Sequence, residues 1–392
     1  MRTLEGVTVV TFEHAIAAPF CTRHLADLGA RVIKVERPGA GDFARGYDNR
    51  TRGLASHFVW VNRSKESLTL DIKQPGGRAV LDALLAKADV VVQNLAPGAA
   101  ARVGLSWEAL SAKHPALTLC DISGYGPDGP YRDKKAYDLL IQSEAGLLSI
   151  TGTPEAPAKS GASVADIAAG VYAYSNVLAA LLRRHRTGKG SHIEVSMLEA
   201  MTEWTSYALY YTYDGAPPPP RAGASHAAIF PYGPFTAGDG ATVILAVQNE
   251  REWEAFCRTV LQRPQLLDNP AYAGNGKRVE RREELRQVVE GVFRELTGPQ
   301  LIGRLDEAGI ANARMNDMQG VWNHPQLKAR ERWTQVGSPV GPLPALLPVG
   351  MAASDDPQMG PVPALGEHTD AILAELGFAG GDIEALKKTG VV

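Results

Sequence analysis

The chain has 392 residues, 45% of them hydrophobic, and its 40 basic and 43 acidic side chains give a net charge of −3. This near-neutral charge argues against a nucleic-acid partner, and the lack of an 18-residue apolar run or a leader sequence argues against a membrane partner. The length suggests two lobes, and three widely spaced cysteines, Cys21, Cys120 and Cys257, are typical of a reducing, cytoplasmic location.

The first 125 residues alternate short apolar runs with helical patterns. We expect strands at 6–12, 31–36, 88–94 and 116–123, and helices at 18–29, 76–88 and 106–113. This alternation predicts an α/β fold with a large Rossmann-like domain, in which helices cover both faces of a parallel sheet. Ligands of such sheets bind at the carboxyl ends of the strands. The segments of interest therefore follow Phe12, Glu36, Asn94 and Ser123.

A long amphipathic helix is predicted from residue 163 onward. Its apolar residues recur at three- and four-residue spacing over about six turns. Ser163 is placed to cap its start, and basic residues at 183–186 suit its end, which Gly188 closes. A further strand is expected at 192–198.

Proline-rich segments divide the chain into domains. The run APPPPRAGAS at 216–225 predicts an extended linker between a large domain at 1–215 and a small α/β domain at 226–336. In the small domain we expect strands near its start and helices at 250–262 and 280–309. Residues 337–365 resemble a second linker. Pattern alone leaves the place of the tail open, and we expect residues 340–392 to return to the large domain.

The sequence motifs of common catalytic sites are either absent from this chain or lack the structural context that they require. Gly124, Gly126 and Gly129 form G-x-G-x-x-G after a strand, but Pro127 and Pro130 interrupt it and no helix opens there. A tight turn is therefore expected in place of a dinucleotide site. The lack of G-x-S-x-G, H-E-x-x-H and Walker A sequences argues against serine hydrolysis, zinc proteolysis and ATP chemistry. We expect no metal site and no permanently bound cofactor.

Asp166 is the acid in the most unusual position. It lies in the first turn of the predicted long helix, ahead of the small residues Ala168, Ala169 and Gly170. The helix dipole and free N–H groups favour a carboxylate there by about 0.3–1 kcal/mol, so we expect it to stay ionised. A poorly solvated carboxylate can act as a nucleophile on an activated acyl group. A helix-capping acid is the alternative interpretation.

Several ordered segments resemble the class III CoA-transferases, the family of formyl-CoA transferase, carnitine CoA-transferases and α-methylacyl-CoA racemase. The segments are VIKVERPGAGDFAR (32–45), NRSKESLTLDIK (62–73), ADVVVQNLAPGAAARVGL (88–105), DISGYGPDGPY (121–131), SVADIAAG (163–170) and RHRTGKGSHIEVSMLEA (184–200). Their order and spacing agree over nearly the first 200 residues. HAAIFPYGPF at 226–235 further resembles the branch that handles mesaconyl-CoA, itaconate, citramalate and malate.

The resemblance implies a reaction and a set of site residues. Asp166 would attack an acyl-CoA thioester, form a mixed anhydride and then an aspartyl-CoA thioester, and pass CoA to a C4–C5 dicarboxylate such as itaconate, mesaconate, citramalate, malate or succinate. The acyl-CoA is then a substrate. The resemblance implies an interlocked homodimer and a CoA groove formed by Arg37, Lys65, Asn94, Leu95, Arg102, Lys135 and Met197.

Five further residues are expected to contact the substrate. The loop after the first strand resembles the family loop that meets the thioester, so we expect His14 and Ile16 there, with His14 or a backbone N–H stabilising the acyl oxygen. A guanidinium fork suits a second carboxylate, which makes Arg45 a candidate for that contact. Tyr137 and His226 complete the set.

Two departures from family patterns narrow the prediction. Family racemases carry a histidine where this chain has Tyr137, and racemisation needs an acid–base partner opposite Asp166. Formyl-CoA transferases carry consecutive glycines where this chain has AGASH at 222–226. We therefore predict CoA transfer between dicarboxylic acids. An α-methylacyl-CoA racemase and a non-catalytic CoA-binding protein stay as alternatives.

Overall fold

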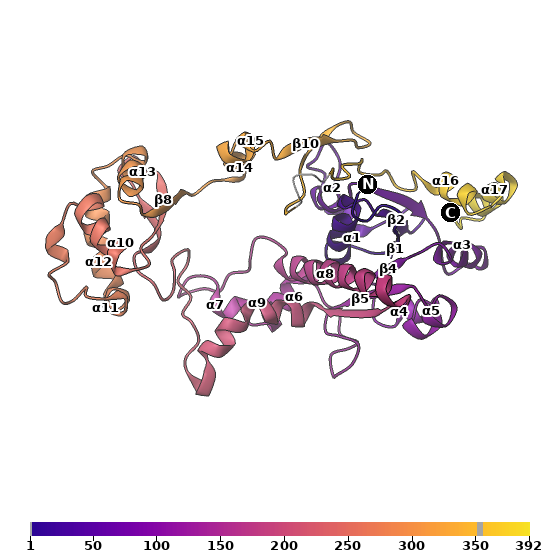
Figure 1. Cartoon of the computed structure of the whole chain (residues 1–392), viewed down its shortest axis with the longest axis horizontal. Coiled ribbons are helices and arrows are strands. Elements are labelled where there is room, and N and C mark those ends of the chain that lie inside the picture. Colours follow the sequence, from indigo (N-terminus) through magenta and orange to yellow (C-terminus); the bar gives the residue numbers. More distant parts are fainter. Residues whose placement is uncertain (1, 351–355) are drawn as a thin grey trace. The chain divides into compact units, whose positions relative to one another are not determined.

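The computed structural model describes residues 2–350 and 356–392, and the chain forms two compact units (Figure 1). Unit 1 comprises Met1–Gly146, Ser160–Ser206 and Leu327–Val392, and unit 2 comprises Leu147–Lys159 and Tyr207–Gln326. The smaller unit therefore begins ahead of the proline run at 216–225 and also takes a segment that we assigned to the large domain. The carboxyl-terminal tail belongs to unit 1.

Unit 1 is built on a parallel sheet. Its strands in the described chain are β1 (Thr8–Phe12), β2 (Arg31–Glu36), β3 (Lys65–Thr69), β4 (Val90–Gln93), β5 (Thr118–Ser123) and β6 (His192–Ser196). The order across the sheet is β3-β2-β1-β4-β5-β6, with every pair parallel. This confirms the predicted Rossmann-like class. The order reverses between β1 and β4, so the loops after these two strands flank the crevice where such sheets bind ligands.

One strand of this sheet, β3, is not predicted from the sequence. Its residues KESLT carry little apolar pattern, yet Lys65 and Ser67 are buried. Ser67 Oγ donates a hydrogen bond of 2.7 Å to Glu36 Oε1, and Lys65 Nζ donates one of 2.6 Å to Glu13 Oε1. Leu68 is the one apolar residue of this edge strand that packs in the core, and polar partners serve the buried Lys65 and Ser67, so hydrophobic periodicity does not reveal the strand.

The helices lie between and beside the strands. Those of the described chain are α1 (Ala17–Asp27), α2 (Ser56–Asn62), α3 (Pro75–Leu85), α4 (Ala99–Arg102), α5 (Trp107–Lys113), α6 (Asp138–Glu144), α7 (Leu147–Ile150), α8 (Val164–Thr187), α9 (Met197–Tyr211), α10 (Glu250–Ala255), α11 (Asn275–Glu280), α12 (Arg282–Phe293), α13 (Gly298–Glu307), α14 (Met318–Trp322), α15 (Pro325–Ala329), α16 (Thr369–Glu375) and α17 (Gly380–Lys388).

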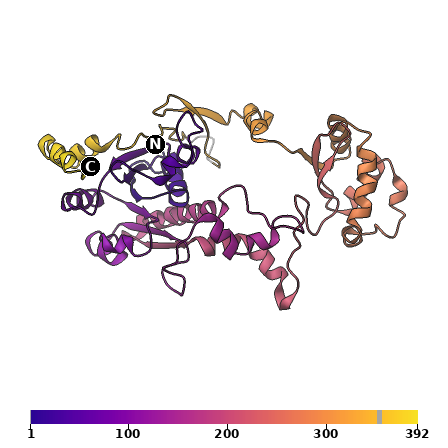
Figure 2. The same cartoon turned by 180° about the vertical axis from the view of Figure 1, so that it is seen from behind.

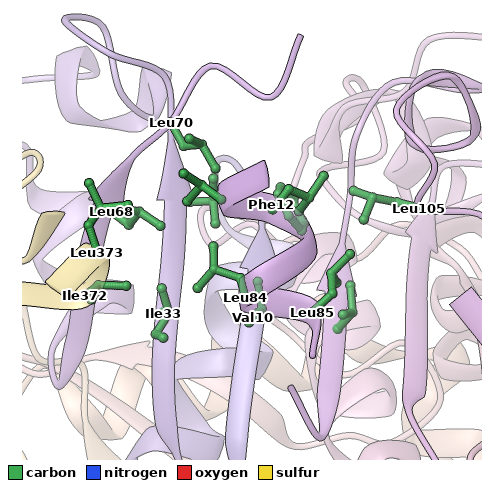
Figure 3. Packing of buried hydrophobic residues seen from close by; sticks show 14 of the residues in the cluster. Val10, Phe12, Ile33, Leu68, Leu70, Leu84, Leu85, Leu105, Ile372 and Leu373 are labelled. Carbon is green, nitrogen blue, oxygen red and sulfur yellow. The ribbon is translucent and has the colours of Figure 1, made fainter. Parts of the chain in front are cut away.

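The larger core of unit 1 lies between one face of the sheet and α3, α5, α16 and α17. Val10 and Ile33 from the strands pack with Leu84 of α3 and Leu373 of α16 (Figure 3). Each such side chain contributes about 1.5–3 kcal/mol when fully buried. The carboxyl-terminal helices α16 and α17 lie beside α3 in both views of the chain (Figures 1 and 2), and they complete this core.

Helix α8 packs against α1, with its small residues at the contact. A Cβ at Gly170 would lie 2.7 Å from the carbonyl oxygen of Ala17, so the two helices approach too closely for any other residue. Gly188, at φ 70°, ends the helix in the left-handed conformation that glycine favours. By length and composition α8 could span a membrane, but Ala165, Ala168 and other small residues are buried within unit 1.

Unit 2 has its own antiparallel sheet and core. The strands β7 (Tyr232–Thr236), β8 (Thr242–Ala246) and β9 (Ala311–Arg314) pair in that order. Phe235, Phe256 and Phe293 form an aromatic centre between this sheet and the helices. The helix expected at 280–309 is divided in two, because Thr297 starts α13 with a capping box. A hairpin of β10 (Trp333–Val336) and β11 (Leu343–Leu346) belongs to unit 1.

Candidate active site

The loops after β1 and β4 are tied together at the switch point of the sheet. The backbone N–H of His14 donates to Asn94 Oδ1 and Asn94 Nδ2 donates to the carbonyl of His14, each over 2.9 Å. The next N–H, of Ala15, donates to Asp42 Oδ1 over 3.1 Å. These two N–H groups are therefore occupied and do not form the predicted oxyanion site. The His14 imidazole stacks on Phe43, with ring centroids 5.2 Å apart, and its Nδ1 lies 3.7 Å from Asp42 Oδ1, which leaves Nε2 for a substrate.

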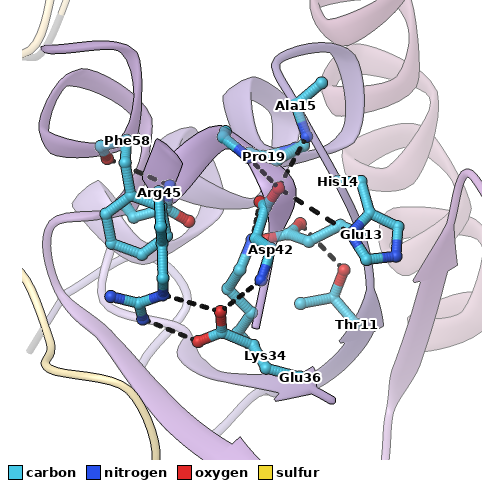
Figure 4. Close-up of polar contacts among 12 residues, drawn as sticks. Thr11, Glu13, His14, Ala15, Pro19, Lys34, Glu36, Asp42, Arg45 and Phe58 are labelled. Carbon is cyan, nitrogen blue, oxygen red and sulfur yellow. Dashed lines mark hydrogen bonds and ion pairs between the residues drawn. The ribbon is translucent and has the colours of Figure 1, made fainter. Parts of the chain in front are cut away.

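A buried ionic cluster holds this loop in place (Figure 4). Asp42 Oδ2 accepts a hydrogen bond from Lys34 Nζ over 2.8 Å, and Lys34 and Lys65 both contact Glu13, at 3.3 and 2.6 Å. All four charged side chains are fully buried. Burial alone would raise the pKa of Glu13, but the two lysines lower it to about 2. The cluster also explains how Ala15 keeps a left-handed φ of 62°, a conformation that needs support from its surroundings.

Two cations expected in the site are engaged elsewhere. Lys65 pairs in register with Val32 at the amino end of the sheet, away from the carboxyl ends where ligands bind, and its ammonium group contacts Glu13. The predicted contact of Lys65 with CoA is therefore not supported by its position. Arg45 donates two hydrogen bonds, of 2.9 and 2.7 Å, to Glu36 and lies 3.8 Å above the ring of Phe58. Its fork is thus occupied by a carboxylate of the protein itself.

Four other cations follow the carboxyl ends of the strands. Arg37 comes directly after β2, Arg102 ends α4 after β4, and Lys135 lies in the loop after β5. All three are exposed and form no ion pair with the described part of the chain. Lys73, in the turn after β3, is exposed in the same way, and sequence reasoning missed it because it missed β3. Met197 directly follows β6 and is buried.

A chain of hydrogen bonds across the sheet fixes the backbone of Leu95. Its N–H donates to Gln93 Oε1 over 2.7 Å, and Gln93 Nε2 donates to Asp121 Oδ1 over 2.8 Å. The other carboxylate oxygen of Asp121 lies 2.7 Å from Nε2 of His192. Strands β4, β5 and β6 thereby position the loop in which we expect Asn94 and Leu95 to meet CoA.

Asp166 lies beside a second carboxylate, Asp138 at the start of α6. Asp138 Oδ1 accepts hydrogen bonds from the backbone N–H groups of Ala165, at 2.8 Å, and Asp166, at 3.3 Å. Gln142 Nε2 donates to the other oxygen of Asp138 over 2.6 Å. The prediction that Ser163 caps α8 is therefore wrong: Ser163 makes no capping hydrogen bond, and Asp138 takes that role across the fold.

This arrangement changes the expected charge of Asp166. Burial, and then the nearby negative charge of Asp138, raise the pKa of Asp166 to about 7 from an ordinary 3.8. This differs from the expectation that Asp166 simply stays ionised, because burial removes solvent from the carboxylate and the N–H groups of Ala165 and Asp166 are satisfied by Asp138. Near neutral pH the carboxyl group is present in both protonation states.

Aromatic and apolar groups surround Asp166. Ile16 packs in one cluster with Ile167, which brings the loop after β1 to the start of α8. The pKa of Tyr47 is raised to about 12 by burial and then by the negative charges of Asp42 and Asp166. Tyr47 is therefore a site residue that the sequence did not suggest, and no motif points to it. Tyr137 is exposed at the start of α6.

His226 belongs to unit 2, where it is exposed and stacks on Tyr232 with ring centroids 5.1 Å apart. Across residues 2–350 and 356–392, no group of three or more histidine, cysteine, aspartate or glutamate side chains is arranged to hold a metal ion.

The chain is similar to known proteins over nearly all its length. The model of the family described as CoA-transferase family III matches residues 4–369. Succinyl-CoA:glutarate CoA-transferase of Mus musculus is 34% identical, over 100% of this chain and 91% of the relative. Succinyl-CoA:mesaconate CoA-transferase of Haloarcula hispanica is 31% identical, over 97% of this chain and 98% of the relative. The crystal structure of a CAIB/BAIF family protein from Brucella suis has a TM-score of 0.85 and 33% identity, over 96% and 99% of the two chains.

Proposed function

The chain belongs to CoA-transferase family III, and from that premise we propose that Asp166 is the nucleophile through which it passes CoA from an acyl-CoA thioester to a short dicarboxylic acid. The observation that carries the proposal is the position of Asp166 itself. It lies in the first turn of α8, its pKa is raised to about 7, and its neighbour Ile167 packs against Ile16 of the switch-point loop.

The raised pKa serves this chemistry. A carboxylate with a pKa of about 7 is more basic than one at 3.8 and therefore attacks a thioester carbonyl more readily. The cost is that about half of the groups are protonated at pH 7. Burial is the main cause of this raised pKa, and Asp138, whose carboxylate is held by Gln142 and by the start of α8, adds to it.

The proposed reaction proceeds in four exchanges. The Asp166 carboxylate attacks the donor thioester and expels CoA thiolate, which leaves a mixed anhydride. The thiolate then attacks the Asp166 carbonyl, so the donor acid leaves with one oxygen of Asp166 and an aspartyl-CoA thioester forms. The acceptor carboxylate then attacks the carbonyl of the aspartyl-CoA thioester, which is the second step in reverse, so a new anhydride forms and the thiolate is freed. Attack of the thiolate on the acceptor carbonyl yields the new acyl-CoA and returns Asp166, which now carries one oxygen of the acceptor.

The carboxyl edge of the sheet offers the groups that CoA requires. Phosphates are bound by lysine and arginine side chains, and four cations that form no ion pair within the described residues follow β2, β3, β4 and β5: Arg37, Lys73, Arg102 and Lys135. We propose that these four meet the phosphates and that the loop of Asn94 and Leu95 binds the rest of CoA.

Two observations support the choice of acid and the oligomeric state. The names of the two relatives described above pair succinyl-CoA with glutarate and with mesaconate, which supports a C4–C5 dicarboxylate as the acid that this chain uses. Beside Asp138, the side chains of Tyr137, Leu139 and Leu140 are 64%, 45% and 47% exposed in the single chain. Apolar groups left open so near a reaction centre support the proposal that a second chain covers them in a homodimer. We further propose that the enzyme works in the cytoplasm without a resident cofactor.

The test is a transfer assay with matched variants. The protein is incubated with succinyl-CoA and one acid from a panel of glutarate, itaconate, mesaconate, citramalate and malate, and new thioesters are followed by mass spectrometry. We expect exchange with at least one acid, none with Asp166→Ala, and unchanged exchange with Asp133→Ala, an exposed control. Exchange that persists in Asp166→Ala contradicts the proposal. Scrambling of an α-proton in deuterated water without transfer would instead identify a racemase, and CoA binding without either reaction a binding protein.

A further inference from the structure

Unit 2 contains a cavity of about 440 Å³ with no role in the chemistry described so far. One side is formed by the segment around 220–230 and another by the first turns of α12. Three guanidinium groups line it, from Arg221, Arg282 and Arg286, together with the apolar surfaces of Pro220 and Phe230. All the lining residues belong to unit 2, so the cavity is complete within that unit. Its volume lies within the range of small-molecule sites.

The arginines are held in fixed orientations by backbone carbonyls. Arg221 donates to the carbonyls of Thr153, over 2.8 Å, and Pro154, over 3.0 Å. Arg282 donates to the carbonyl of Ala227 over 2.6 Å. A guanidinium group has five N–H donors, so each side chain is oriented and still has donors to spare. A preorganised arginine loses little conformational freedom when it binds an anion.

The positive charge of the cavity is only partly neutralised. Arg286 pairs with Glu290 at 3.3 Å, but neither Arg221 nor Arg282 forms an ion pair with the residues that the structure describes. Glu155 interacts with Arg221 from beyond ion-pair distance, and Glu283, which also lines the cavity, is exposed to solvent. An excess of fixed, partly buried cations favours an anionic ligand.

The spacing and lining indicate the class of anion. Arg282 and Arg286 are four residues apart on α12, so they lie on one face of the helix at about 5–6 Å between Cβ atoms. The positive end of the helix dipole adds to their field. Arg286 is further fixed by stacking above Phe235 at 4.7 Å and by a hydrogen bond of 3.2 Å to Ser225 Oγ. Separated guanidinium forks suit two carboxylates, and Phe230 and the prolines suit the methylene groups between them.

We propose that this cavity binds a short aliphatic dicarboxylate, with Arg221, Arg282 and Arg286 as its ligands. This deepens the proposed function, on which it rests for the identity of the acid, by assigning recognition of the carboxylate substrate to residues of unit 2. The ligand class follows from the cavity itself, so binding can be measured with no acyl-CoA present.

Calorimetric titration of glutarate into the full chain tests the assignment. An Asp166→Asn background prevents turnover. Relative to that background, we expect Arg282→Met and Arg286→Met to weaken binding at least tenfold, equivalent to about 1.4 kcal/mol, and Arg282→Lys to weaken it less. The matched control is Arg258→Met, because Arg258 is exposed elsewhere in unit 2 and pairs only with Glu254 among the described residues. This variant should bind glutarate as tightly as the background does. Equal affinities in all variants overturn the proposal, as does binding of butyrate or inorganic phosphate as tight as that of glutarate.

Hydrogen exchange is a second test that needs no substitution, so it can still be made if a variant does not fold. In the unsubstituted chain, glutarate should slow hydrogen exchange in peptides covering 218–230 and 279–288. Protection confined to 131–145 and 160–170, in unit 1, refutes the assignment. If thioester transfer proceeds but these peptides do not respond, only this inference fails. If they respond but no acid accepts CoA, the proposed function fails and the binding site stands.

Discussion

Replacing Asp166 with asparagine should increase the free energy of unfolding, and the increase should be larger at alkaline pH than at acidic pH. The structure raises the pKa of Asp166 from 3.8 to about 7, so ionisation opposes folding. A group whose pKa is raised in the folded state stabilises the protein below its unfolded pKa, and that contribution is lost as the pH rises through the folded value. Asparagine has the same shape and no charge, so the variant escapes this loss.

The magnitude follows from the two pKa values. Between 3.8 and 7 the loss grows by about 1.4 kcal/mol for each pH unit, or about 4 kcal/mol in total. From pH 5 to pH 8 it is about 3 kcal/mol, and since Asp166 keeps some contact with solvent we expect about 1–3 kcal/mol to be measured.

Urea unfolding of unit 1, followed by circular dichroism at pH 5, 6, 7 and 8, measures this difference. The free energy of unfolding of Asp166→Asn minus that of the unsubstituted chain should increase steadily across the series. Asp133→Asn, an exposed acid of the same unit, should show no such trend. A difference that stays constant from pH 5 to pH 8, or that falls, would refute the claim that Asp166 is destabilised as a carboxylate.

Three further predictions follow from the same region. Asp138→Asn removes a negative charge beside Asp166, so the acidic limb of the kcat/KM profile should move to lower pH; an unmoved limb would show that burial alone sets this pKa. Lys65→Met leaves Glu13 with one cation fewer in a fully buried site, so it should lower the free energy of unfolding by about 3 kcal/mol and change the KM for acyl-CoA little. Lys73→Met should instead raise that KM about tenfold and change the stability little. The reverse pattern in steady-state kinetics and urea unfolding would place Lys65, and not Lys73, in the CoA site. Glu13 has a folded pKa of about 2 and a usual value of 4.5, so it contributes about 3 kcal/mol to the free energy of unfolding above pH 4.5, and this contribution should disappear as the pH falls toward 2. Acid unfolding at a fixed urea concentration should show a steep loss of stability below pH 4.5. A flat response there would contradict the buried pairing of Glu13 with the lysines.

The strands of the large sheet differ in how well the sequence predicts them. Those rich in valine, such as β1 and β4, are evident because both of their faces are buried. Strand β3 is not, since Lys65 and Ser67 are buried by charges on distant segments. That omission also explains why Lys65 was expected in the CoA groove, because its place at the amino end of the sheet is evident only once β3 is known.

The candidate nucleophile was found by sequence, but its electrostatic state was not. A carboxyl group in the first turn of a helix is normally stabilised as an anion. Here burial disfavours the anion and Asp138 accepts hydrogen bonds from the N–H groups of Ala165 and Asp166, and together these reverse the expected effect. Such a contact between separate helices has no local sequence signal. Tyr47 was missed for the same reason, because only the fold brings it near Asp166.

The central claim, covalent transfer through Asp166, is tested most directly by following oxygen. In the proposed sequence of exchanges, each turnover replaces one carboxylate oxygen of Asp166 with one from the acceptor acid. A single turnover with succinyl-CoA and an acceptor whose carboxylates carry ¹⁸O, followed by digestion and mass spectrometry, should place one heavy oxygen in the peptide that contains Asp166. Repeated turnover should add a second, and neither should appear unless acyl-CoA is present. Rapid production of the new thioester with no label in that peptide would contradict the account.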